Sequence, residues 1–265
     1  MPLRFRVLLA GAAICALALM IPIAQSAPVA AQSKPAAKQV RVPILMYHYV
    51  RTNPIATDLV GADLSVDPQS FAREMLMLSK AGMHTITLDD LYAALTQGHA
   101  LPAHPVILTF DDGYEDFYTA AFPVLQALHM RATSFIITGK AGWKGYMTWD
   151  QMRDIERSGL VQFESHTVNH VELNKISPAK AEQELIDSKS TLEKELGGSV
   201  KYLAYPSGRF NATVVNLAQA VGYEAAVTTQ YGSLQSSSGL LALSRVRIPG
   251  AESLWSFALS VWSKN

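Results

Sequence analysis

Along most of the chain, segments with the hydrophobic pattern of a strand alternate with segments whose apolar residues recur at helical spacing. Short runs rich in Val, Ile, Leu and Phe have the composition of buried strands. The segments between them carry apolar residues at helical spacing, and several begin with Ser, Thr, Asp or Asn as an N-cap. The predicted strands cover residues 42–50, 84–88, 106–110, 132–137, 160–165, 202–206, 223–229 and 241–248. The predicted helices cover residues 67–82, 89–98, 117–130, 148–159, 177–198 and 211–222.

This alternation predicts an α/β fold with a parallel sheet covered by helices, because parallel strands need long crossover connections and helices supply them. Seven or so strand–helix units are too many for a small open sheet and suit closure into a barrel. No internal repeat or low-complexity tract is visible in the sequence. We therefore expect a single distorted (β/α)7 barrel.

The first 31 residues differ from the rest of the chain. A basic start, MPLRFR, precedes an uncharged apolar run over residues 7–24, and small residues follow as far as Ala31. This order is typical of an export signal cleaved after Ala31, or of an N-terminal membrane anchor where the segment is retained. We expect residues 32–41 to be a linker and residues 42–265 to form the working domain. That domain is then periplasmic, held in the cell envelope or secreted.

The net charge of the chain bears on which partners it can bind, and its cysteine content bears on how it is stabilised. The chain has 22 basic and 22 acidic residues, so its formal net charge is zero and nothing predicts an electrostatic grip on nucleic acid. A neutral substrate and a monomeric protein fit this balance better. The single cysteine, Cys15, lies within the apolar run, so a chain cleaved after Ala31 has no disulfide and depends on its core for stability.

Polar side chains follow three of the predicted strands at the point where each strand ends. Asp111 and Asp112 follow VILTF, His166 and His170 follow VQFES, and SGR, residues 207–209, follows YLAYP. In a parallel barrel the carboxyl ends of the strands converge on one mouth. These side chains are therefore expected to face one another.

The adjacent carboxylates of Asp111 and Asp112 indicate a metal. Neighbours on a strand point to opposite faces, so both acids reach one site only if the chain turns there, which Gly113 permits. A divalent cation would bind one carboxylate and keep the other ionised as a base. His166 and His170, four residues apart, suit two imidazoles on one ion. One Asp and two His leave a position for water, the pattern of a catalytic metal site.

The motifs TFDDGY, SHTVNH and YPSG, in this order, resemble those of the NodB-homology polysaccharide deacetylases of carbohydrate esterase family four. ILMYH and ATSFI are similar to segments of the exported poly-N-acetylglucosamine deacetylase branch. The resemblance, over residues 42 to 248, implies a NodB-like barrel and metal-dependent removal of acetyl groups from an N-acetylated polysaccharide. It also implies that Asp111 is the general base and that a divalent metal, Zn²⁺ or another transition metal, is held by Asp112, His166 and His170.

The third motif departs from the family pattern Arg-Pro-Pro-Tyr-Gly, because Ala204 stands in place of the arginine that orients the base. Alternation along LSRVRI places Arg245 on the same face as Leu243. A buried arginine needs a carboxylate, so we expect the Arg245 guanidinium within hydrogen-bonding reach of Asp111. Arg209 is the competing cation, but it follows a glycine and is expected to be exposed.

Two further roles complete the predicted site. The backbone N–H of Ser207 is expected to hold the oxyanion, and His48, at the end of the first strand, is the candidate acid for the leaving amine. Two other functions remain open at this point: a carbohydrate-binding protein that keeps the fold without catalysis, and a metal-dependent amidase that acts on small molecules.

Overall fold

The computed structural model describes residues 2–3, 37–55 and 57–262. Residues 37–55 and 57–262 belong to one compact unit. Apart from residues 2–3, the predicted export segment lies outside the described residues. Within the described ranges no helix combines the length and the apolar character needed to cross a membrane.

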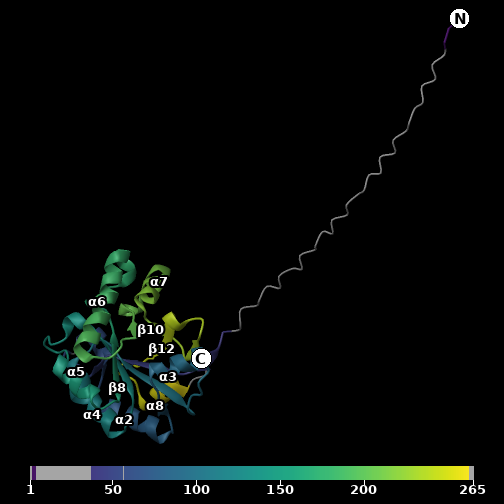
Figure 1. Cartoon of the computed structure of the whole chain (residues 1–265). Coiled ribbons are helices and arrows are strands. Elements are labelled where there is room, and N and C mark those ends of the chain that lie inside the picture. Colours follow the sequence, from purple (N-terminus) through teal and green to yellow (C-terminus); the bar gives the residue numbers. More distant parts are fainter. Residues whose placement is uncertain (1, 4–36, 56, 263–265) are drawn as a thin grey trace. The chain divides into compact units, whose positions relative to one another are not determined.

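Seven parallel strands form a closed barrel (Figure 1). Around the barrel the order is β2, β12, β10, β9, β8, β7 and β6, and the pairing of β6 with β2 closes the ring. The strands are β2 (Ile44–Tyr47), β6 (Pro105–Phe110), β7 (Ala132–Ile136), β8 (Val161–Ser165), β9 (Tyr202–Ala204), β10 (Ala225–Tyr231) and β12 (Leu243–Arg247). A short strand, β5 (His84–Thr85), adds to β6 outside the ring. The predicted (β/α)7 barrel is confirmed.

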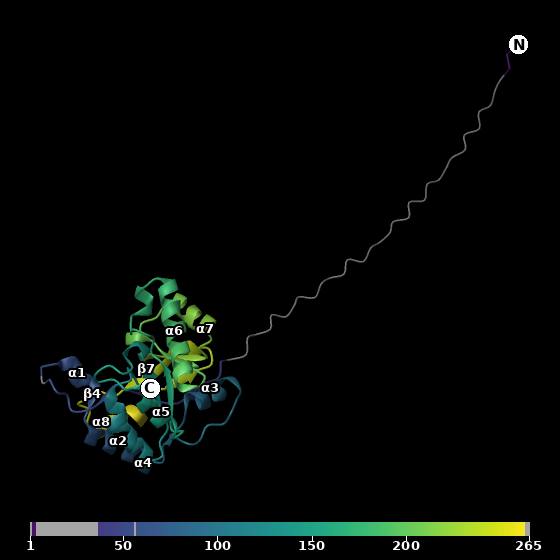
Figure 2. The ribbon, with the colours of Figure 1, turned by 60° about the vertical axis from the view of Figure 1, so that its left-hand side comes forward.

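Helices surround the barrel (Figures 1 and 2). They are α2 (Pro68–Lys80), α3 (Leu88–Thr96), α4 (Phe122–Ala127), α5 (Trp149–Glu156), α6 (Pro178–Leu196) and α7 (Ala212–Val221). Most begin at the predicted caps: the side chains of Asp67 and Ser177 accept backbone N–H groups, and Thr148 forms a capping box with Gln151. The helix predicted over residues 117–130 is interrupted, because a π-helical turn (Phe117–Ala121) precedes α4.

Several short elements escaped the sequence analysis. They are α1 (Leu59–Leu64), α8 (Leu254–Trp262), the strand β4 (Ser65–Val66), and the antiparallel pair β1 (Gln39–Arg41) and β11 (Leu234–Ser236). β4 pairs in parallel with β3 (Tyr49–Val50), which is the end of the strand predicted over residues 42–50. All these strands are two or three residues long, too short for a period-2 pattern to register. Because β1 pairs with β11, residues 39–41 pack with the folded unit.

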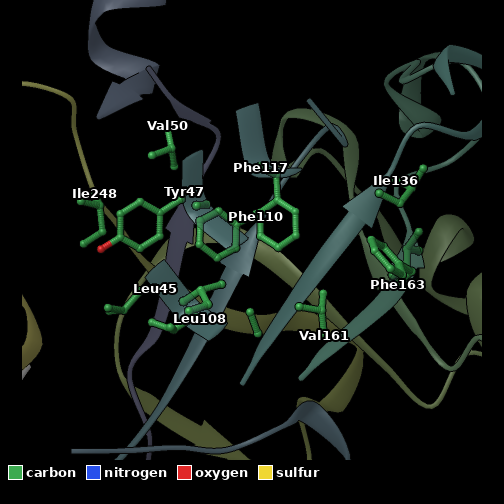
Figure 3. Close-up of a cluster of buried hydrophobic side chains, with 14 of the residues drawn as sticks. Leu45, Tyr47, Val50, Leu108, Phe110, Phe117, Ile136, Val161, Phe163 and Ile248 are labelled. Atoms are coloured by element: carbon green, nitrogen blue, oxygen red, sulfur yellow. The ribbon is translucent and has the colours of Figure 1, made fainter. Parts of the chain in front are cut away.

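The core has two layers. Ile44, Ile107 and Leu243 belong to a cluster that fills the barrel interior, whereas their neighbours on the strands pack outward under the helices. In this outer layer the rings of Tyr47, Phe110 and Phe117 lie in a row (Figure 3). Ring centroids are 5.2 Å apart for Tyr47 and Phe110, and 4.7 Å apart for Phe110 and Phe117. This row fixes the carboxyl ends of β2 and β6, where the polar residues begin.

The barrel interior becomes polar toward the carboxyl ends of its strands. On β6, alternation puts Ile107, Thr109 and then Asp111 on the inner face. On β12, Leu243 is followed on the same face by Arg245. These five side chains are buried, and three of them, Thr109, Asp111 and Arg245, form a polar layer above the apolar interior.

Candidate active site

The loops that leave β6, β8 and β9 each contain residues with left-handed backbone conformation. In the first loop these are Asp112, with φ of 75°, and Gly113, with φ of 80°. His170 in the second loop and Ser207 in the third have φ of 56° and 54°. Such conformations are costly for residues other than glycine and gather at functional sites. The turn at Asp112 allows two consecutive carboxylates to serve one site, so Asp112 itself, and not Gly113 alone, makes the turn.

The structure brings Asp112, His166 and His170 together. Oδ1 of Asp112 lies 3.4 Å from Nε2 of His166 and 3.6 Å from Nε2 of His170. One ligand atom from each of the three residues lies within 4.8 Å of the others. Two donors placed about 2.1 Å from an ion at a tetrahedral angle are about 3.4 Å apart, so the spacing fits shared coordination of one cation. One carboxylate and two imidazoles suit Zn²⁺ or a similar divalent transition metal.

Surrounding groups orient these donors. Nδ1 of His166 lies 2.7 Å from the carbonyl oxygen of Ala204, which can only accept, so this nitrogen carries the hydrogen and Nε2 is left for a metal. Burial by itself would raise the pKa of Asp112, but the neighbouring His166 holds that pKa below its usual value. The His166–His170 loop is fixed by Glu184, whose Oε2 accepts the backbone N–H groups of residues 168 and 169 at 2.9 Å each.

Asp111 forms a buried ion pair with Arg245. The guanidinium donates from Nη1 to Oδ1 at 2.8 Å and from Nη2 to Oδ2 at 2.7 Å, and the two side chains are 3% and 1% exposed. The contact expected from the sequence is therefore present. Arg245 is held in turn by Nε donating to the carbonyl oxygen of Thr228 at 2.8 Å and by Nη1 donating to Oγ1 of Thr109 at 3.1 Å.

The ion pair determines the charge state of Asp111. Burial by itself would raise the pKa of this carboxyl, but the charge and the two hydrogen bonds of Arg245 hold the pKa well below its usual range. Asp111 is thus ionised at neutral pH in spite of complete burial. An ionised, oriented carboxylate beside the three metal-ligand candidates is what a general base requires.

His48 also lies at this site. It lies between β2 and β3, and its Nε2 is 3.9 Å from Oδ2 of Asp111. Burial lowers the pKa of His48, although the charges of Asp111 and Asp112 act in the opposite direction. The imidazole is therefore neutral at pH 7 and able to accept or donate a proton next to the candidate base.

The remaining predicted residues stand apart from these contacts. Ser207 is the exposed residue of the turn Pro206–Gly208 after β9, and the role of its N–H stays a prediction. Arg209 is exposed, whereas Arg245 holds the carboxylate.

Three tyrosines that the predicted site did not include lie next to it: Tyr114, which could line a sugar cleft or pack under a helix on sequence grounds, and Tyr49 and Tyr146, which sequence reasoning missed. Tyr114 stacks on Tyr49 with ring centroids 3.7 Å apart, and its other neighbour is Tyr146, at 5.1 Å. The charge of Asp112 contributes, after burial, to raising the pKa of both Tyr114 and Tyr146, which places their hydroxyls in its field. The available signal was that Tyr114 lies two residues after Asp112 and that Tyr49 directly follows His48, but an aromatic residue after a strand equally often packs under the next helix.

Comparison with known proteins agrees with this geometry. The family model described as polysaccharide deacetylase matches residues 98–226, which include Asp111, Asp112, His166 and His170. YxkH of Bacillus subtilis (strain 168), which is named for the same family, is 36% identical over 214 residues, covering 80% of this chain and 74% of that protein. The chain belongs to the polysaccharide deacetylase family.

Two further relatives extend the family assignment. The deacetylase PplD of Streptococcus pyogenes, solved with acetate, is 34% identical with a TM-score of 0.79, covering 84% of this chain and 99% of that one. The poly-β-1,6-N-acetyl-D-glucosamine N-deacetylase of Staphylococcus aureus (strain MSSA476) is 30% identical over 160 residues, 56% of this chain and 55% of that protein. The predictions of a NodB-type polysaccharide deacetylase and of an enzyme are confirmed at the level of the family.

Proposed function

We propose that this polysaccharide deacetylase is a metal-dependent hydrolase that removes acetyl groups from an N-acetylated polysaccharide outside the cytoplasmic membrane. One observation supports this proposal most directly. The same site contains three residues spaced for one metal ion, Asp112, His166 and His170, and beside them the ionised carboxylate of Asp111, which Arg245 holds. Relatives named as N-deacetylases of poly-N-acetylglucosamine support an amino-sugar polymer as the substrate.

The metal would be held by Asp112, His166 and His170, and when bound it supplies a Lewis acid that polarises the acetyl carbonyl. Asp111 accepts a proton from the attacking water as the water adds to the carbonyl carbon. Arg245 keeps both oxygens of this carboxylate fixed through its two hydrogen bonds. The N–H of Ser207 is proposed to donate to the oxygen on which negative charge develops.

The proton must then reach the leaving nitrogen. His48 lies 3.9 Å from Asp111 and is neutral, so it can take the proton that Asp111 receives and donate it to the amine as the C–N bond breaks. The products are a free amino sugar and acetate. The site thus needs only water as its second substrate.

The N-terminal sequence supports export. A basic start and an apolar run over residues 7–24 are proposed to direct the chain across the cytoplasmic membrane, either as a signal cleaved after Ala31 or as a retained anchor. The catalytic domain over residues 42–265, which follows the predicted linker of residues 32–41 whose last three residues form β1, then meets envelope or secreted polysaccharide. N-terminal sequencing of the chain recovered from cell fractions tests this, and an intact N-terminus in the cytosol would contradict it.

Acetate release from a panel of acetylated glycans tests the reaction. The purified chain is stripped with a chelator and reloaded with Zn²⁺, and acetate is measured with poly-N-acetylglucosamine, chitin oligomers and peptidoglycan. We expect release that requires metal. Glycan binding without release would identify a carbohydrate-binding protein, and hydrolysis of small amides alone would identify an amidase.

Asp111→Asn tests the assignment of the base. Asparagine keeps the size of the side chain but cannot accept a proton from water, so turnover should fall at least about a hundredfold while the metal content stays at the wild-type value. The matched control is Asp154→Asn, a partly exposed carboxylate on α5 whose loss should leave turnover unchanged. Full activity in Asp111→Asn would remove this residue from the base position.

A further inference from the structure

Helix α8 presents an apolar surface on both of its sides. Phe257 and Val261 are buried against the body of the protein, as expected for a helix that packs on a barrel. On the opposite side stand Trp255, Leu259 and Trp262, and they are 73%, 53% and 42% exposed. The helix contains no charged residue between positions 254 and 262. A surface helix ordinarily carries polar residues on its outer side, so this one is suited to a second contact.

The three exposed residues form one ridge. They stand four and three residues apart, which places them within the same narrow arc of the helix. Large side chains exposed singly are ordinary, but two tryptophans and a leucine in one row mark a contact surface. We call Trp255, Leu259 and Trp262 the α8 ridge.

Helix α2 lies beside α8 and adds positive charge. Its outer face carries Arg73, Leu76 and Lys80, all exposed and spaced three and four residues apart. A groove between the two helices is lined by Arg73, Leu76, Met77, Lys80, Ala81 and Leu254. The only acidic residue of α2, Glu74, is buried on the other side. The surface therefore combines the apolar α8 ridge with cations.

We propose that the α8 ridge docks on an anionic phospholipid bilayer, with Arg73 and Lys80 facing the headgroups. Tryptophan rings with leucine between them bind at the boundary of headgroups and acyl chains, and basic residues beside them are attracted to anionic lipid. A second copy of this chain is a poorer occupant, because a twofold contact through the patch brings its cations together with no acid opposite them. Either form of the proposed export segment brings the chain to a membrane.

Tryptophan fluorescence tests the contact directly in the full chain. All four tryptophans lie at position 143 or beyond, so quenching by lipid reports on the folded unit even when the N-terminal segment itself enters the bilayer. The probe is vesicles of phosphatidylglycerol mixed with dibrominated phosphatidylcholine, compared with the same vesicles without bromine. We expect emission to drop with the brominated lipid only.

Variants at chosen positions identify which tryptophans are quenched by the brominated lipid and which cations contribute to binding. Replacing Trp255 and Trp262 together by phenylalanine should abolish the bromine effect, whereas Trp143→Phe, at a residue that is also exposed (58%), should preserve it. With the chain cleaved after Ala31, Arg73→Gln and Lys80→Gln should each weaken partitioning about fivefold, and the pair about twenty-fivefold. Arg157→Gln, at an exposed cation directly after α5, should change nothing.

Two results would overturn the proposal. One is that the full-length chain floats with the vesicles but its tryptophan emission is the same with brominated and with unbrominated lipid. The other is a dimer in sedimentation equilibrium without vesicles that disappears in Trp255→Ala, since a second copy would then cover the ridge. None of these measurements depends on acetate release from soluble glycan. If the lipid-docking proposal fails, the proposed deacetylation reaction is therefore unaffected.

Discussion

Replacing Arg245 by lysine separates the charge of this residue from its geometry. In the structure the guanidinium fixes both oxygens of Asp111 with hydrogen bonds of 2.8 and 2.7 Å. Two further bonds, to Thr228 and Thr109, fix the guanidinium itself. Lysine keeps a positive charge beside the carboxylate but offers a single ammonium in place of a planar fork, so Asp111 becomes free to rotate.

The size of the effect follows from that freedom. A displacement of about 1 Å in a reacting group costs on the order of a hundredfold in rate, so kcat for Arg245→Lys should fall about a hundredfold, or about 2.7 kcal/mol in activation free energy. Metal content and KM should stay near the wild-type values, because Arg245 donates its hydrogen bonds to Asp111, Thr109 and Thr228 and not to the metal-ligand candidates. Arg245→Met also removes the charge and leaves a buried carboxylate unpaired, which should cost about 3–5 kcal/mol of folding free energy.

The assay combines three measurements on each variant. Acetate release from an acetylated glucosamine oligomer gives kcat and KM, elemental analysis gives metal per chain, and urea unfolding gives the free energy of unfolding. Arg247→Lys is the matched control, since Arg247 lies on the same strand but is half-exposed and pairs with Asp63. Its kcat should not change.

Two outcomes would refute the reasoning. If Arg245→Lys turns over at the wild-type rate, orientation of Asp111 by the fork is irrelevant to catalysis. If Arg245→Lys loses metal together with activity, the arginine acts through the metal site and not through the base.

The remaining predictions concern the metal and the core. His170→Ala should reduce metal affinity by more than the roughly ten- to hundredfold that loss of an outer hydrogen-bond partner costs, because only two ligands remain; a full metal complement by elemental analysis would exclude His170 as a ligand. Burial raises the pKa of Glu74 to about 7 although Tyr47 donates a hydrogen bond to it, so the folded state holds this proton more tightly than the unfolded chain. The stability contributed by protonated Glu74 is complete below about pH 4.5 and is lost as the pH rises through 7, by about 3 kcal/mol in total. In Glu74→Gln, which can still accept from Tyr47, this loss should disappear; urea unfolding between pH 5 and 8 that shows the same slope in both proteins would contradict the assignment.

Much of the fold could be predicted from the sequence because its signals are local. The caps at Asp67, Thr148 and Ser177 depend on side chains that bond to their own backbone a few residues away, and the structure contains all three. Helix α8 could have been found from its apolar spacing, but its apolar surface on both sides gives no single face to detect. The π-helical turn before α4 was not predicted, since hydrogen-bond spacing within a helix has no comparable sequence signal.

The sequence by itself determined the inventory of the site. The order of Asp111, Asp112, His166 and His170 after buried strands indicated a metal, and strand alternation turned Arg245 inward, because both depend on the covalent chain and the pleat of a strand. Tertiary structure alone decided how these residues meet. Asp111 and Arg245 are 134 positions apart, and Ala204, which has no functional side chain, orients His166 through its backbone carbonyl. A backbone oxygen is present at every residue, so only the pairing of β8 with β9 in the barrel selects which one receives the hydrogen bond.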